Sequence, residues 1–337
     1  MTPKRINPKT SKGHDLYEIS SLVQKSLRRN DVKFALYSSN ELMPKYVKYL
    51  WKRLLTVSAE DCHDMVTAKI LALCRKSEKV KAEEERRCVE EALSILLSAR
   101  KSRDADYYAC NLFNSRDRID LSKYGQEVFD ASAATKNGHN VFFLKSVFDK
   151  AIDECDDITA GYAANEIKVY YPNFCWDMIE QKASVKFNSA MLSKEIHALR
   201  MTDERTEYSN TLLFRSKAIV LLIALSCGLP IEVYEDKVEH PQVTFDDVSE
   251  ERLFIPSYTY DCHTLKGKMM GKTKKQFVEA EFNALTPRCE GLYDNASWER
   301  FFYNSKHGFY TKEYTPHPSE ARVQEIDMFL TTPTIFM

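Results

Sequence analysis

Glycine and proline are scarce in this sequence, and long apolar runs are absent. Its 337 residues include nine Gly and eleven Pro, too few for the many tight turns of an all-β fold. The longest apolar run, 218–227, is shorter than the roughly 20 residues that a membrane-spanning helix needs. The N-terminal residues are polar and carry no apolar core of a secretory signal. We therefore expect an all-α soluble protein, cytoplasmic or nuclear, with no membrane partner.

The chain also lacks paired cysteines and an overall charge. Its nine cysteines form no CxxC pair, which favours reduced thiols and argues against zinc. The formal net charge of −1 gives no reason to expect a nucleic-acid partner from the chain as a whole. The charge is nevertheless uneven, because residues 1–53 contain twelve Lys or Arg and only four acidic residues. Any electrostatic binding must therefore be local.

Residues 12–64 have apolar side chains at helical spacing and predict three helices with apolar inner faces and basic outer faces. Asn30-Asp31 should end the first helix and cap the second. Pro44 should lie near the first turn of the third, where a missing N–H costs little. The third helix should end at Glu60-Asp61.

The same reasoning divides the whole chain into four segments. They are a flexible basic arm (1–13), an N-terminal helical domain (14–134), a second helical half (135–230) and a mixed loop and helix appendage (231–337).

Three features support this division. The turn sequence TKNGH at 135–139 is the first candidate boundary. Helical patterns are expected at 174–199 and at 211–227, of which the second is the most apolar of the chain and should be central to its half. The appendage should be irregular, with an aromatic-rich tail and a last helix at 319–330.

A lysine-rich window in the appendage is the strongest candidate for a nucleic-acid contact. No acid lies between Cys262 and Val278, and such a run can neutralise several backbone phosphates without reading sequence. The alternative is a solvated helix face. With the basic N-terminal block added, the candidate nucleic-acid-binding residues are Lys25, Arg28, Arg29, Lys52, Arg53, Lys266, Lys268, Lys272, Lys274 and Lys275.

Catalytic and cofactor motifs are not predicted. Gly267 and Gly271 are separated by three residues where a P-loop has four, and no apolar strand precedes them, so no nucleotide cofactor is expected. No GxSxG nucleophile motif occurs. The chain is therefore expected not to be an enzyme.

A metal-dependent nuclease or phosphohydrolase stays open as an alternative. Its ligands would be drawn from Glu60, Asp61, His63, Asp261 and His263, since carboxylates suit Mg²⁺ or Mn²⁺. Against it, Glu60-Asp61 is typical of a helix end. We expect His263 to bond a neighbouring backbone group and so fix the turn before Gly267.

Two groups of residues resemble a known family. The first comprises Gly13-His14-Asp15-Leu16-Tyr17-Glu18, Leu22 to Arg29, Asp31, Ala35-Leu36-Tyr37, Tyr49 to Leu54 and Ser58-Ala59-Glu60-Asp61, and the second Pro256-Ser257-Tyr258, Asp261 to Thr264, Gly267 and Met270-Gly271. Together they resemble the region C-terminal to the ATPase core in the RarA/MgsA group of AAA+ replication-associated recombination proteins, which are related to clamp loaders. About a quarter of the chain carries the similarity.

The resemblance implies an all-helical collar domain of the kind that oligomerises clamp-loader-like ATPases. Nothing in the chain matches the ATPase core, and Cys62-His63 departs from the family pattern. We therefore expect a non-enzymatic accessory protein of DNA replication or recombination. Its partners would be DNA and either further copies of itself or a clamp-loader-like AAA+ ATPase. Another possibility is a phage or mobile-element protein that binds a host ATPase of this type.

Overall fold

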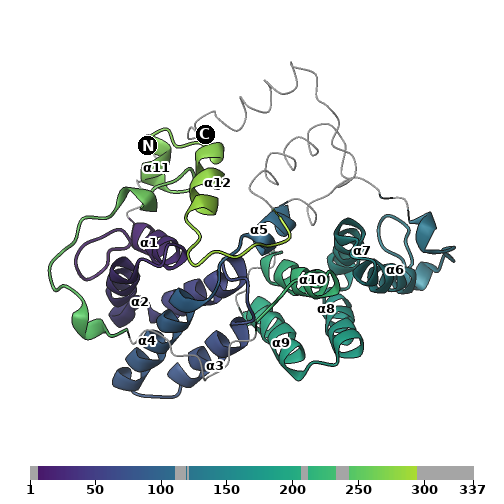
Figure 1. Ribbon diagram of the computed structural model, residues 1–337, viewed down its shortest axis with the longest axis horizontal. Helices are drawn as coiled ribbons and strands as arrows, with labels where there is room; N and C mark the ends of the chain where they lie inside the picture. Colours follow the sequence, from purple (N-terminus) through teal and green to yellow (C-terminus); the bar gives the residue numbers. More distant parts are fainter. Residues whose placement is uncertain (1–6, 111–118, 120, 206–211, 233–242, 294–337) are drawn as a thin grey trace. The chain divides into compact units, whose positions relative to one another are not determined.

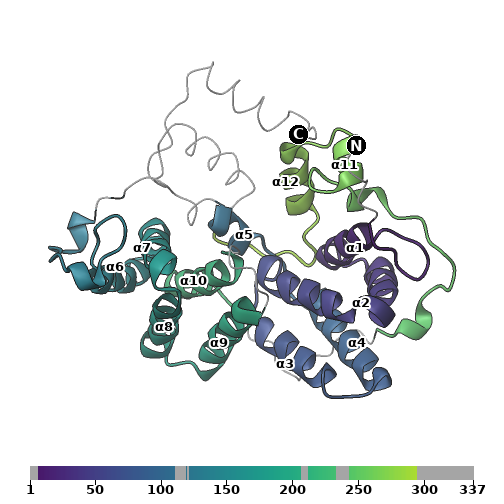
Figure 2. The same ribbon diagram turned by 180° about the vertical axis from the view of Figure 1, so that it is seen from behind.

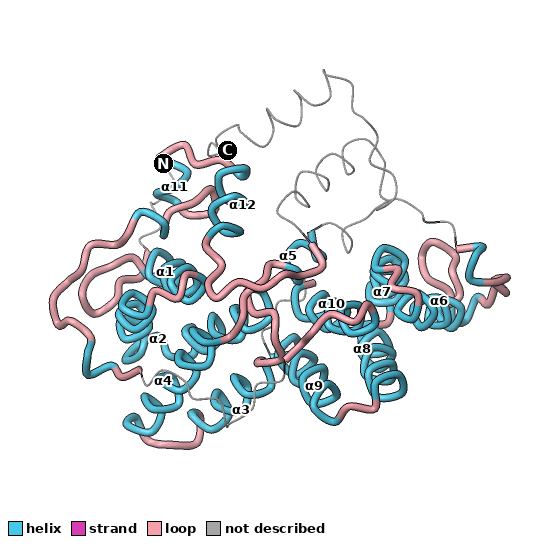
Figure 3. The backbone as a smooth tube through the Cα atoms, in the orientation of Figure 1, coloured by secondary structure: helices cyan, strands magenta, loops and turns pink. Residues whose placement is uncertain are grey.

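The computed structural model describes residues 7–110, 119, 121–205, 212–232 and 243–293 (Figure 1). These residues are mostly helical, and apart from isolated bridges they contain no β-structure (Figure 3). The all-α prediction is confirmed at this level. Backbone contacts group the described residues into two units, one made of 7–102 and 243–289, the other of the described residues between 103 and 232 together with 290–293. None of the described helices combines the length and the apolar composition needed to cross a bilayer.

The first unit begins with two helices that pack on each other, α1 (Leu16–Arg28) and α2 (Val32–Glu60). Asn30 between them has a left-handed φ of 54°, and the Asp31 carboxylate caps α2 by accepting from the Phe34 N–H at 3.2 Å. The predicted break and cap at Asn30-Asp31 are confirmed.

Three helices were predicted in 12–64, and the structure has a kink close to where the third was expected to begin. α2 spans 29 residues and consists of two helical stretches that meet at Tyr46, which has non-helical φ and ψ and lies two residues after Pro44. Proline has no N–H for the helix ladder, which accounts for the break in regular helix at this point. The end of α2 agrees with expectation, because Glu60 is its last residue and Asp61 its C-cap.

The rest of the first unit comes from two distant parts of the chain. The helices are α3 (Thr67–Ser77), α4 (Ala82–Ser98), α11 (Leu265–Met269) and α12 (Lys274–Asn283). The later segment is tied to the end of α4, since the Lys101 N–H donates to Pro287 O at 2.7 Å and Lys101 O accepts from the Cys289 N–H at 3.2 Å. Residues 243–289 therefore belong to the first unit, whereas the sequence placed them in a separate appendage.

The second unit contains a consecutive series of packed helices (Figure 2). They are α5 (Asp104–Tyr108), α6 (Val141–Asp153), α7 (Asp157–Tyr170), α8 (Pro172–Lys182), α9 (Ala190–Arg205) and α10 (Leu213–Ser226). α10 is buried over most of its length and contacts five other helices of the unit, α5 to α9. The central apolar helix predicted at 211–227 is thus found within those bounds.

The single helical pattern expected over 174–199 is interrupted. α8 passes into a π-helical turn at Ala183–Phe187, and Asn188 then takes a left-handed φ of 45° before α9 begins. Asparagine tolerates this conformation better than most residues, and apolar periodicity does not reveal it.

The described part of the predicted flexible arm is attached to the first unit. The Thr10 hydroxyl donates to the Glu41 carboxylate at 2.6 Å, and the Lys12 N–H reaches the same carboxylate at 3.2 Å. The last helix expected at 319–330 and the aromatic-rich tail lie outside the described residues.

Candidate functional site

The cations of α1 lie at the centre of the first unit and hold its two chain segments together. We call Lys25 and Arg28 with their partners Asp61, Asp261 and Glu281 the α1 ion network. Lys25 is 4% exposed and Arg28 only 1%. The prediction that these two residues form a basic outer face was therefore wrong, because both point inward and are neutralised there.

Lys25 binds the turn that precedes α11. Its ammonium donates to Thr259 O at 2.8 Å and forms an ion pair with Asp261. Burial lowers the pKa of Lys25 to about 8, against the opposing effect of Asp261. Burial alone would raise the pKa of Asp261, but the ammonium of Lys25 and the N–H of His263 bring it below its usual value.

Arg28 joins the end of α2 to α12. Its guanidinium binds both oxygens of Asp61, at 2.9 and 3.0 Å, in the forked geometry that suits a carboxylate. The third nitrogen, Nη1, pairs with Glu281 of α12, and a carboxylate oxygen of Glu60 lies 3.6 Å from Nη2. Arg28 is therefore committed to three carboxylates and is unavailable to a phosphate.

Arg29 and Arg53 are only partly exposed and also have partners within the unit. The Arg29 guanidinium stacks on the Tyr258 ring at 4.6 Å, and burial together with the neighbouring Arg28 lowers the pKa of Arg29 to about 10. Arg53 donates to Ser20 at 3.0 Å and to Gln24 at 2.8 Å. Lys52, on the same helix, is half-buried.

The lysine-rich window folds as two helices joined by a tight turn, residues 265–283, which we call the basic hairpin (Figure 1). Thr264 caps α11, and Gly271 in the turn has a φ of 70°. Thr273 and Gln276 form a reciprocal capping box at the start of α12. The hairpin conformation thus follows from local residues.

Backbone contact fixes the hairpin against the turn at Asp261. The Asp261 carboxylate accepts from the N–H groups of His263 and Thr264 at 2.8 and 3.1 Å. It is therefore Asp261, rather than His263 as expected, that fixes this turn. Gly267 packs so tightly that a Cβ there would overlap the Asp261 backbone.

The five candidate lysines of the basic hairpin are all at least partly exposed. Lys266 is exposed, and its ammonium lies 4.1 Å from the centre of the Tyr260 ring; Lys268, Lys272, Lys274 and Lys275 are half-buried. Three apolar side chains of α11 and its turn share this surface, with exposed fractions of 53% for Leu265, 76% for Met269 and 52% for Met270. The hairpin presents positive charge and apolar surface together.

The metal alternative finds no support in the geometry. Asp61 is bound by Arg28 and Asp261 by Lys25, while His263 stacks edge-on against Phe277. Across the described part of the chain, no three His, Cys, Asp or Glu side chains are arranged to hold a metal ion. The carboxylates that suggested a metal site instead neutralise the cations of α1.

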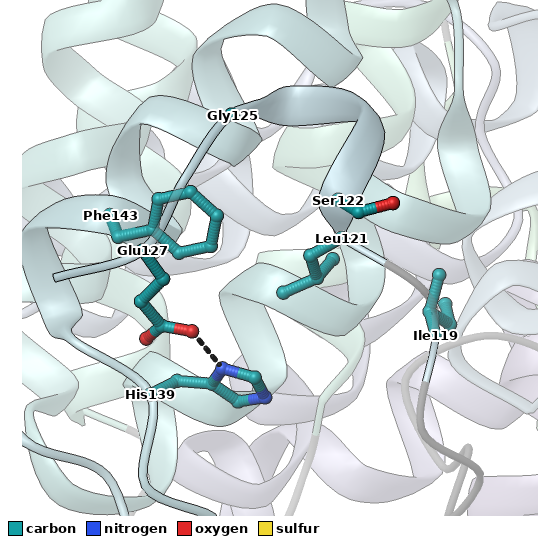
Figure 4. A pocket seen from close by; sticks show the side chains of 7 residues that line it. All are labelled: Ile119, Leu121, Ser122, Gly125, Glu127, His139 and Phe143. Atoms are coloured by element: carbon teal, nitrogen blue, oxygen red, sulfur yellow. Dashed lines mark hydrogen bonds and ion pairs between the residues drawn. The ribbon is translucent and has the colours of Figure 1, made fainter. Parts of the chain in front are cut away.

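A pocket in the second unit involves residues that the sequence reading did not select. It has a volume of about 480 Å³ and is lined by Glu127 and His139 among others (Figure 4). His139 is 4% exposed, and its Nδ1 lies 2.9 Å from the Glu127 carboxylate. The sequence TKNGH predicts only a turn at 135–139. Its last residue, His139, is the feature of the sequence that could have indicated a polar site here.

Comparison with known proteins identifies no relative of this chain. No family model matches it, and neither the curated proteins nor the solved structures include a match.

Proposed function

We propose that this protein is a non-enzymatic helical accessory factor that contacts the phosphate backbone of DNA through the lysines of its basic hairpin. The observation that carries the proposal is the different environment of two sets of cations. Lys25 and Arg28 are buried against carboxylates, whereas the hairpin lysines lie at the surface. Surface lysines release condensed counterions when they bind phosphates, which favours binding to any DNA sequence.

The role in replication or recombination, and the collar type of the fold, rest on the resemblance to the RarA/MgsA group. The segments that carry this resemblance lie together in the first unit, because Lys25 of α1 pairs with Asp261 and Ser21 donates to Thr259 O at 2.9 Å. Their joint packing is what a shared domain would require.

A charge-reversal experiment tests the DNA contact. We expect Lys266→Glu/Lys272→Glu to weaken binding of a fluorescent 30-base-pair duplex by about tenfold or more in low salt, since each reversal replaces an attraction with a repulsion. The matched control is Lys79→Glu/Lys81→Glu, which changes the same charge at two exposed lysines of the first unit. Equal weakening by both pairs would show a non-specific charge effect and refute the hairpin as the contact.

The exposed apolar side chains favour a second candidate, docking of a protein partner or of a second copy. Leu265, Met269 and Met270 offer flexible apolar contacts of the kind used at adaptable interfaces. The partner would be a clamp-loader-like ATPase or this chain itself. If the chain associates with itself through this surface, light scattering over a concentration series should show a mass above that of one chain, and Met269→Asp/Met270→Asp should reduce that mass. An unchanged mass in the variant would exclude self-association through this surface.

A further inference from the structure

The pocket of the second unit combines an apolar wall with one fixed carboxylate. Ile119, Leu121 and Phe143 supply apolar lining, and Glu127 and His139 supply the polar side. Its volume of about 480 Å³ lies within the range of roughly 300–1,000 Å³ typical of small-molecule sites. In Figure 4 the Glu127 carboxylate lies between the Phe143 ring and the His139 imidazole.

Glu127 is held in place by its neighbours. One carboxylate oxygen accepts from the backbone N–H of Asn140, the residue that caps α6, and the other is 2.9 Å from His139 Nδ1. The opposite nitrogen of His139 lies 3.3 Å from the Tyr162 hydroxyl. With the proton on Nδ1, the imidazole donates to Glu127 and accepts from Tyr162, so both of its nitrogens are used.

The Glu127 carboxylate has two contacts, the His139 imidazole and the backbone N–H of Asn140. Among the described residues, no lysine or arginine forms an ion pair with it. A carboxylate offers about four acceptor positions, of which these contacts use two. The Glu127 side chain is 25% exposed and lines the pocket.

We propose that this pocket binds a small organic cation, a protonated amine with an aromatic or aliphatic body. The ammonium group donates to Glu127 and lies beside the Phe143 ring, whose face attracts a cation. The body of the ligand packs on Ile119 and Leu121. An anionic ligand is disfavoured because the Glu127 carboxylate would repel it. A metal ion is disfavoured because the described residues around Glu127 do not form a metal-binding group.

Titration calorimetry on the full chain tests this with three probes of the same shape. We expect phenethylamine to bind at least about tenfold more tightly than 2-phenylethanol, and phenylacetate not to bind. Glu127→Gln should remove the preference for the amine while leaving weak binding of the alcohol, because the apolar wall is unchanged. The control Glu154→Gln, an exposed glutamate that follows α6, should behave as the wild type.

Retained binding of 2-phenylethanol by Glu127→Gln, together with an unchanged thermal unfolding midpoint, shows that the pocket is intact in that variant. The proposal is overturned if the amine and the alcohol bind equally to the wild type, or if the amine does not bind. It is also overturned if Glu127→Gln binds the amine as tightly as the wild type does. If Glu127→Gln binds neither the amine nor the alcohol and unfolds at a lower temperature, Glu127→Asp is used in its place. This variant shortens the side chain and keeps the carboxylate, and an unchanged preference for the amine over the alcohol would then contradict the proposal.

Discussion

Lys25 and Arg28 carry positive charge into the interior of the first unit, where each has a carboxylate partner from a distant part of the chain. Burying a charge is costly, and an ion pair repays that cost only when its geometry is good and its remaining hydrogen bonds are satisfied. Arg28 meets this condition through its forked contact with Asp61. Lys25 meets it less completely, because burial outweighs the effect of Asp261 on its pKa.

The lowered pKa of Lys25 predicts a specific dependence of stability on pH. Between about pH 8 and pH 10.5 the unfolded chain keeps the Lys25 proton while the native chain has released it, so rising pH favours the native state. The free energy of unfolding of the wild type should therefore rise relative to that of Lys25→Met across this window, by up to about 3 kcal/mol. Urea unfolding of both proteins at several pH values measures the difference.

The control for this prediction is Lys33→Met, which removes an exposed lysine. Its difference from the wild type should stay flat over the same window. A flat difference for Lys25→Met as well would mean that Lys25 titrates as an exposed lysine does, and the α1 ion network would be wrong.

At the scale of elements, the basic hairpin depends on close contact between α11 and the turn that precedes it. Thr264 links α11 to this turn, since its hydroxyl accepts from the Gly267 N–H of α11 at 3.1 Å and donates to Asp261 O of the turn at 3.0 Å. Glycine is the only residue type that fits at position 267, because any Cβ there would overlap the backbone of Asp261. The same Asp261 binds Lys25, so the position of the hairpin is linked to α1.

Gly267→Ala should therefore lower the free energy of unfolding by about 2 kcal/mol. Overpacking of a tight contact costs roughly 1–3 kcal/mol, and the better helix propensity of alanine returns at most about 1 kcal/mol. The comparison variant is Met269→Ala in the same helix, where the side chain is 76% exposed and the change should be below about 0.5 kcal/mol. Urea denaturation that ranked the two variants in the opposite order would contradict the close packing of α11.

The positions of the helices were easier to predict from the sequence than the contacts that their side chains make. Apolar spacing was enough to place α10, and the Asn30-Asp31 pair was enough to place the break between α1 and α2, because both depend on neighbouring residues. The burial of Lys25 could not be predicted, since Asp261 lies 236 residues further along the chain. The pocket was missed for a different reason, because Glu127 and His139 are 12 residues apart and come together only when the loop before α6 folds back.

At the scale of the whole molecule, charge is balanced overall and unevenly placed. The chain has 48 basic and 49 acidic residues, so long-range attraction to DNA from the net charge is absent. Lys25 and Arg28 are neutralised inside the first unit, and the hairpin lysines are the surface cations through which we propose that the chain contacts DNA. Binding to DNA should therefore be short-ranged and sensitive to salt.

The most direct test of this account is the affinity of the wild-type chain for a short DNA duplex, measured by fluorescence anisotropy from 25 to 200 mM salt (about an eightfold range). If the five hairpin lysines contact phosphates, the logarithm of the association constant should fall with the logarithm of the salt concentration with a slope of about −3 to −5, since each contact contributes about −0.9. The absence of binding at the lowest salt concentration, or a slope close to zero, would contradict the proposal that this protein binds DNA through the basic hairpin.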